Sequence, residues 1–225
     1  GIQQPERGLE EDYLPGTLTE TSTLNSILTD NSVQTSWWKE SDATENRFYT
    51  LDKSSPQVLH ISTHGFYRAD NEEDSSKILK KIIFYEDDPL SRSGILLSGA
   101  NFAWQYGYNP NEEEDGILTA AEIANLDLSN TQLAVLSACE TGLGDIEGNE
   151  GVYGLQRAFK MAGVDKLIMS LWQVPDAETS EFMISFYTNL VEYSDIRKAF
   201  NVTQRGMQAK YKNEPYKWAA FVLVE

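Results

Sequence analysis

Apolar residues along the chain gather in short runs that are separated by longer amphipathic segments. Three runs are rich in Val, Ile and Leu and are bounded by small or polar residues, which is typical of buried strands: 58–62, 132–137 and 166–171. A further run at 218–224 predicts a last strand, and weaker strand signals lie at 33–38, 78–84 and 94–97. The pattern therefore predicts a sheet in the interior of the protein.

Apolar residues with helical spacing lie between the predicted strands. They predict helices over 17–28, 44–51, 119–124, 151–162, 176–191 and 195–211. Thr119, with Glu122 three positions later, has the spacing of a capping box, and Gly163 is placed to end the preceding helix. Strands that alternate with helices favour an α/β fold with a mostly parallel central sheet and helices on both faces.

Two of the predicted strands end in motifs that carry reactive side chains. The segments VLHISTHG (58–65) and LAVLSACETG (133–142) each begin as an apolar run and then change to small residues and glycine. A buried strand that delivers a side chain to the rim of a sheet has this pattern. One motif delivers His64 and the other Cys139, the single cysteine of the chain. On adjacent strand ends the two would form a thiolate–imidazolium pair, the core of a cysteine peptidase.

Simpler interpretations of these residues stay open at this point. A single cysteine is usually a small buried hydrophobic residue, and a histidine near a strand is often a hydrogen-bonded core residue. His60 lies inside its apolar run and fits that description, whereas His64 follows the run and precedes Gly65. Residue types alone do not bring Cys139 and His64 together in space.

The two motifs resemble the catalytic motifs of CHAT domains, caspase-like peptidase domains found mainly in bacteria. The resemblance extends to DGILTAAEI (115–123), EGVYGLQRAF (150–159), SLWQVPD (170–176) and YKWAAFVL (216–223). Several motifs in order are a far more specific signal than one short pattern. The resemblance implies a three-layer caspase-like sandwich over 16–225, preceded by a polar tail or linker over 1–15. Such domains usually follow helical repeats or other sensor modules, so a longer multidomain protein is expected.

The resemblance also implies a role for individual residues. Cys139 would be the nucleophile, and His64 would hold the thiolate and later protonate the leaving amine. The backbone N–H groups of Gly65 and Cys139 would form the oxyanion hole. Ser137, two positions before the cysteine, would line the pocket for the P1 side chain, the substrate residue that precedes the cleaved bond.

Selection of a basic P1 residue would need an acid that Ser137 does not supply. Glu140, next to the cysteine, and Asp176, beyond the third predicted strand, are the candidates in the quoted motifs. Glu140 could equally point to solvent, and Asp176 could simply cap its helix. We predict cleavage after lysine or arginine rather than after aspartate, because the chain is strongly acidic and the two catalytic motifs and SLWQVPD (170–176) contain no arginine for an acidic P1 residue.

Composition restricts the partners of the chain. With 35 acidic and 18 basic residues, the formal net charge of −17 disfavours direct contact with nucleic acid or with anionic membranes. The single cysteine excludes an internal disulfide, and no signal peptide or membrane span is visible, so a cytoplasmic protein is predicted. The acidic run at 112–115 is interpreted as a solvated loop, since its spacing is not that of a calcium loop, and we predict neither metal nor cofactor.

The function that these observations favour is a cysteine endopeptidase that cleaves a protein or peptide partner. A sensor domain or regulatory protein would control it, through the long irregular segments at 66–81 and 101–116. The alternative is a catalytically silent CHAT-like module that only binds a partner. A small-molecule hydrolase with the same dyad has no support beyond the dyad itself.

Overall fold

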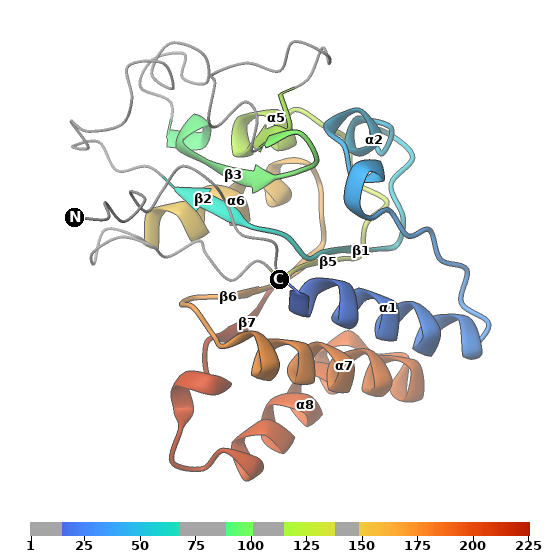
Figure 1. The fold of residues 1–225 in the computed structure, drawn as a ribbon, viewed down its shortest axis with the longest axis vertical. Helices are drawn as coiled ribbons and strands as arrows, with labels where there is room; N and C mark the ends of the chain where they lie inside the picture. Colours follow the sequence, from blue (N-terminus) through green and yellow to red (C-terminus); the bar gives the residue numbers. More distant parts are fainter. Residues whose placement is uncertain (1–14, 68–88, 101–114, 138–148) are drawn as a thin grey trace, which may run out of the picture.

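The computed structural model describes residues 15–67, 89–100, 115–137 and 149–225 (Figure 1). The predicted strand at 78–84, the acidic residues 112–114, Cys139 and Glu140 lie outside the described residues.

The central sheet contains the strands that were predicted most clearly. Its order is β1-β5-β6-β7, formed by β1 (Val58–Ile61), β5 (Leu133–Leu136), β6 (Lys166–Ser170) and β7 (Phe221–Val224). The first three strands are parallel and adjacent, and β7 is antiparallel to β6. The prediction that the strands at 58, 132 and 166 are neighbours in one parallel sheet is thus confirmed.

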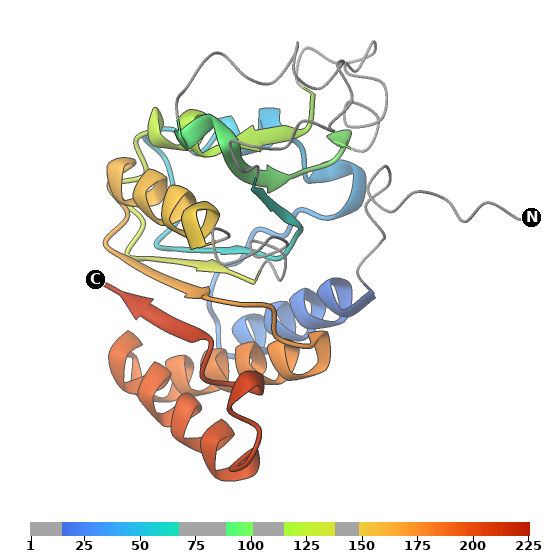
Figure 2. The same cartoon turned by 90° about the vertical axis from the view of Figure 1, so that its left-hand side faces the viewer.

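Helices cover both faces of this sheet (Figure 2). One face packs on α1 (Pro15–Asp30), α7 (Asp176–Tyr193) and α8 (Ile196–Lys210), and the other on α2 (Glu45–Tyr49), α5 (Ala120–Ala124) and α6 (Asn149–Met161). Successive side chains of β5 point to opposite faces of the sheet. Leu133 and Val135 belong to the core cluster on the side of α1, α7 and α8, and Ala134 and Leu136 belong to the cluster on the side of α2, α5 and α6. Because all four are fully or almost fully buried, the three-layer α/β prediction holds.

A second, antiparallel sheet lies on the α5–α6 side. Its order is β2-β3-β4, from β2 (Gly65–Tyr67), β3 (Ser93–Leu96) and β4 (Ile117–Thr119). Only β3 was predicted, since the other two are three-residue strands whose pairing is set by β3 rather than by their own pattern. Short 3-10 helices lie at η1 (Glu40–Asp42), η2 (Pro89–Arg92) and η4 (Pro215–Lys217).

Two predicted helix boundaries and one predicted edge strand had different outcomes. The capping box of Thr119 and Glu122 is present, and Gly163 has a φ of +94° just after α6, so these helix boundaries are confirmed. The strand predicted at 33–38 is wrong: these residues belong to no ladder, and the β1 edge beside them carries no described strand. The weak strand signal at 33–38 did not provide the partner that a strand requires.

Candidate functional site

The two motif strands end side by side at the carboxyl edge of the central sheet. Ile61, the last residue of β1, pairs with Leu136, the last residue of β5. The Ser137 N–H then donates to the Ile61 carbonyl at 2.8 Å, which extends the register by one residue. The chain segments that lead to His64 and to Cys139 therefore leave the sheet at the same place.

The backbone at His64 is held from the second sheet. The Leu96 N–H donates to the His64 carbonyl at 2.9 Å, and the Thr63 hydroxyl donates to the Leu96 carbonyl. His64 is half-buried and stands between the end of β1 and the start of β2. One backbone bond and one side-chain bond to Leu96 thus hold the chain at His64 against β3.

The amide of Gly65 points away from the second sheet. In the antiparallel ladder Gly65 lies opposite Ile95, and His64 lies opposite Leu96. The Leu96 N–H donates to the His64 carbonyl, so His64 and Leu96 are a hydrogen-bonded pair. Pairs alternate along an antiparallel ladder, so the Gly65 N–H is directed to the side of β2 away from β3. An N–H group in this orientation takes no part in the β2–β3 ladder.

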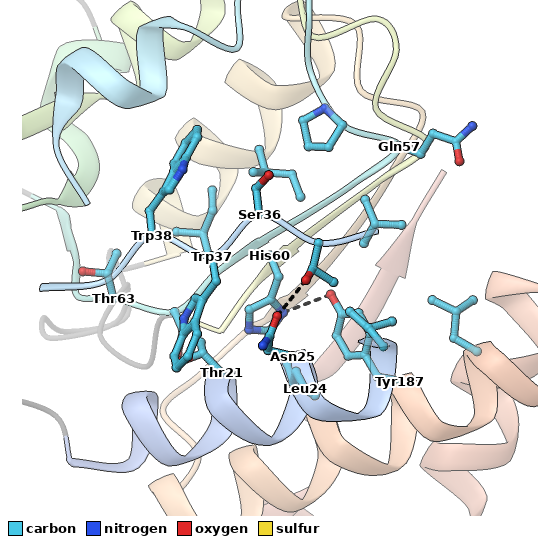
Figure 3. A pocket seen from close by; sticks show the side chains of 18 of the residues that line it. Thr21, Leu24, Asn25, Ser36, Trp37, Trp38, Gln57, His60, Thr63 and Tyr187 are labelled. Atoms are coloured by element: carbon cyan, nitrogen blue, oxygen red, sulfur yellow. Dashed lines mark hydrogen bonds between the residues drawn. The ribbon is translucent and has the colours of Figure 1, made fainter. Parts of the chain in front are cut away.

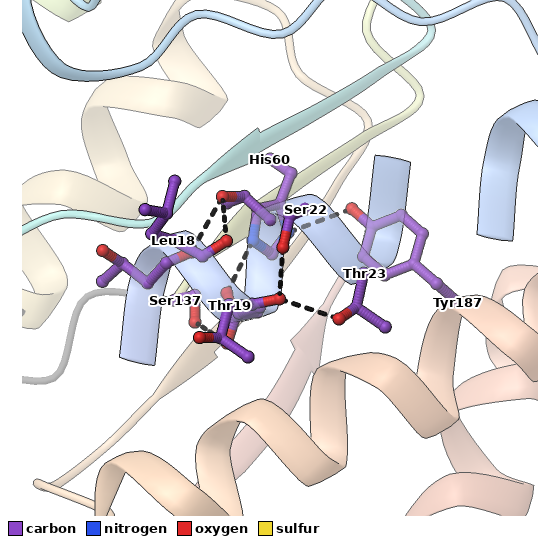
Figure 4. A network of polar contacts seen from close by, with 10 residues as sticks. Leu18, Thr19, Ser22, Thr23, His60, Ser137 and Tyr187 are labelled. Atoms are coloured by element: carbon purple, nitrogen blue, oxygen red, sulfur yellow. Dashed lines mark hydrogen bonds and ion pairs between the residues drawn. The ribbon is translucent and has the colours of Figure 1, made fainter. Parts of the chain in front are cut away.

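A buried acid that sequence reasoning missed joins both motif strands to α1. The side chain of Glu20 is on α1 and only 2% of the residue is exposed. Its Oε1 lies 3.0 Å from His60 Nε2, and its Oε2 lies 3.1 Å from Ser137 Oγ. His60 Nδ1 in turn lies 3.1 Å from the Tyr187 hydroxyl on α7 (Figure 4). His60 is therefore a hydrogen-bonded interior residue, as one reading of the sequence suggested.

The sequence did contain a sign of Glu20. It precedes the buried Leu24 by four residues, so a charged residue occupies the apolar stripe of its helix. Its partners His60 and Ser137 are far away along the chain, and no local pattern predicts them.

Burial makes the network sensitive to high pH. Burial, with the nearby charge of Glu20, raises the pKa of Tyr187 above its ordinary value of 10.0. The folded state thus holds this proton more tightly than the unfolded chain does, so the stabilisation is complete below about pH 10 and is lost as the pH rises beyond it.

We expect Tyr187→Phe to lower the free energy of unfolding at pH 7 by about 1 kcal/mol, because the hydrogen bond to His60 is lost. Above about pH 10 the difference in free energy of unfolding between the variant and the unchanged chain should decrease. The unchanged chain loses stability there because Tyr187 ionises more readily when unfolded, whereas phenylalanine has no proton to lose. Urea unfolding at pH 7 and at high pH measures both values. A difference in free energy of unfolding that is the same at both pH values would contradict the raised pKa of Tyr187.

The other predicted site residues have different surroundings. Ser137 is 5% exposed and its hydroxyl contacts Glu20. Asp176 is exposed in the first turn of α7, where Pro175 is the N-cap residue, so Asp176 is not the N-cap that the simpler reading allowed. Cys139 and Glu140 lie outside the described residues, so their assignment stays a prediction. Among the described residues no group of three His, Cys, Asp or Glu side chains is arranged to hold a metal ion.

A large groove of about 2460 Å³ runs along the edge of β1 that pairs with no described strand (Figure 3). It extends from α1 and the segment with Trp37 and Trp38 to the motif end at Ser62 and His64. The histidine of the motif, His64, is thus one of the residues that line this groove.

Comparison with known proteins identifies the family. The CHAT domain family matches residues 4–225. The chain belongs to this family. The prediction made from the ordered motifs is confirmed, and the caspase-like sandwich agrees with it. Within the part of the chain that the structure describes, no helix is both long and apolar enough to cross a membrane.

Similar curated proteins are much longer than this CHAT domain. The chain is 33% identical over 112 residues to Tetratricopeptide repeat protein 28 of Mus musculus and 32% identical over 109 residues to that of Homo sapiens. Each match covers 48% of this chain and 4% of the relative. These relatives are named for tetratricopeptide repeats.

Proposed function

We propose that this CHAT domain is a cysteine endopeptidase in which His64 and Cys139 form the catalytic dyad. The observation that carries the proposal is the common end of β1 and β5 at one edge of the sheet. Cys139 follows Ser137 by two residues, and two residues of chain span at most about 7 Å. Connectivity thus keeps the thiol near the strand end from which the histidine motif also leaves.

The chemistry follows from the residues of the motifs. The His64 imidazole would take the Cys139 proton, and the thiolate would attack the substrate carbonyl to form a thioester and release the amine. The Gly65 N–H, directed away from β3, would donate to the oxyanion together with the Cys139 N–H. Water would then hydrolyse the thioester, with the imidazole as base.

A library of peptides digested by the protein and read by mass spectrometry tests this function and its specificity together. We expect cleavage at defined positions that disappears in Cys139→Ala. If the folded protein cleaves no peptide and binds a protein partner in the same form, the silent interaction module would be the correct interpretation.

The proposed P1 preference is for lysine or arginine. Asp176 supports it, because this exposed carboxylate stands near the carboxyl edge at the start of α7. We expect Asp176→Asn to lower the preference for basic over neutral P1 residues by about tenfold, with an unchanged midpoint of thermal unfolding, since an exposed charge contributes little to stability. Glu140→Gln is the companion variant. A digest that shows cleavage after aspartate, or unchanged preference in both variants, would contradict basic selection.

Regulation by an attached repeat region, a sensor domain or a partner protein is part of the proposal. The repeat architecture named for the relatives supports it. A bacterial origin and a cytoplasmic location rest on the motif resemblance and on the single cysteine alone.

A further inference from the structure

The groove beside β1 borders backbone groups that no described strand uses. The carbonyls of Gln57 and Ile61 accept hydrogen bonds from the β5 side. Because successive residues of a strand direct their backbone groups to opposite sides, the N–H and C=O groups of Val58 and His60 are directed to the groove. Within the described residues no backbone hydrogen bond reaches them from that side, and Val58 is 37% exposed. Such an edge is a template for one more strand.

Both faces of this edge have apolar walls that an added strand would contact. On one face Leu28 of α1 packs on the core cluster of α1, α7 and α8, and on the other Trp38 packs on the cluster of α2, α5 and α6. Both side chains line the groove (Figure 3). Its volume of about 2460 Å³ exceeds the roughly 300–1,000 Å³ of sites for small molecules, so the groove suits a polypeptide.

Basic side chains gather at the amino edge of the sheet, at the end of the groove away from His64. Lys166 begins β6, and Arg197 in the first turn of α8 pairs with Glu225, which follows β7. The groove is lined by five basic and three acidic residues, whereas the whole chain has 18 basic and 35 acidic ones. An acidic segment complements this groove better than a second copy of the chain does. The charged residues are Lys39, Lys166, Arg197, Lys198 and Arg205, with Glu40, Asp195 and Glu225.

We propose that the groove binds an acidic segment of the protein substrate as an added strand beside β1. The inference rests on the proposed function, and it identifies the class of substrate, because the groove reaches His64 at its other end. Main-chain hydrogen bonds to Val58 and His60 would give affinity, while alternate side chains contact Leu28 and Trp38. From His64 back to the start of β1 the chain spans about 20 Å, or about six residues. The acidic residues of the substrate therefore lie about six positions from the cleaved bond.

The test uses two peptides that share a lysine cleavage site and a spacer of about six valine and threonine residues. One carries a run of glutamate beyond the spacer, and the other the same run of glutamine. In the unchanged chain kcat/KM should favour glutamate by about tenfold. Lys198→Gln combined with Arg205→Gln should remove most of this preference. Lys53→Gln combined with Lys212→Gln is the matched control, because these exposed lysines do not line the groove, and its preference should not change.

The same pair of peptides is made with the acidic run before and after the cleavage site. An added strand has one direction, so the preference for glutamate should occur on one side only. Equal preferences on both sides would show a general attraction between charges and would overturn the docking site, as would an unchanged preference in Lys198→Gln with Arg205→Gln.

A second pair of variants tests the backbone of the edge. Val58→Pro removes the N–H group that faces the groove, at a position where an edge strand tolerates proline, whereas Val58→Ala keeps it. Proline should weaken binding of the fluorescein-labelled glutamate peptide to Cys139→Ala by about tenfold, measured by fluorescence anisotropy, and alanine by much less. Equal binding with proline and alanine at this position would contradict strand addition. If Val58→Pro does not fold, the charge variants decide.

The two measurements separate the docking site from the chemistry. Binding that requires the Val58 N–H and the basic residues, without cleavage by the unchanged chain, would retain the docking site and overturn the peptidase function. Cleavage without a preference for glutamate would retain the peptidase and overturn the docking site. Absence of both cleavage and binding would overturn both.

Discussion

Replacement of Cys139 by alanine is expected to abolish peptide cleavage while the protein remains folded. The change removes the nucleophile, so the rate should fall by at least about 10³-fold. The position follows the last residue of β5 by three, and alanine differs from cysteine only by the loss of the small thiol group. The midpoint of thermal unfolding should therefore change little.

His64→Ala should have nearly the same effect, because the thiolate then lacks its imidazolium partner. The members of a dyad act as a unit, so the double variant should be scarcely worse than either single one. Retained activity in Cys139→Ala, or losses that multiply in the double variant, would contradict the dyad.

Gly94→Ala is expected to have the largest effect on stability. A Cβ at this position would lie 2.3 Å from the Leu118 carbonyl oxygen and 2.6 Å from the ring of Phe66. The Leu118 carbonyl belongs to the paired strand β4 and cannot move without disturbing the second sheet. We expect a loss of about 3 kcal/mol in the free energy of unfolding, as for other forced insertions into a packed core.

Gly206→Ala is the matched control for this variant. Gly206 is exposed within α8, and a Cβ there meets nothing within 4 Å. Alanine should stabilise the protein by about 0.5–1 kcal/mol, because glycine is a poor helix former. Urea unfolding of both variants measures the difference, and equal effects of the two changes would contradict the packing described for β3.

The central sheet was predictable because its strands are buried on both faces. The residues of β5 are almost all apolar, since Leu133 and Val135 pack on one helical layer while Ala134 and Leu136 pack on the other. The second sheet was not predictable to the same degree. β2 and β4 are three residues long, too short for a pattern, and their partners come from distant parts of the chain.

The candidate site likewise has a part that the sequence predicted and a part that it did not. The resemblance of the motifs indicated His64, Gly65 and Ser137, and the structure brings these positions to one edge. It did not indicate Glu20, because the contacts of Glu20 with His60 and Ser137 are made across three separate elements. A charged residue in the apolar stripe of a helix is a local signal that its partner must be sought elsewhere.

The central claim is tested most directly by labelling with a peptidyl acyloxymethyl ketone that carries lysine at P1. The account predicts that the protein forms one covalent adduct, located at Cys139 by mass spectrometry, and that His64→Ala abolishes the adduct while the fold is retained. A folded protein that is not labelled, or labelling that persists at the same rate in His64→Ala, would contradict a His64–Cys139 peptidase.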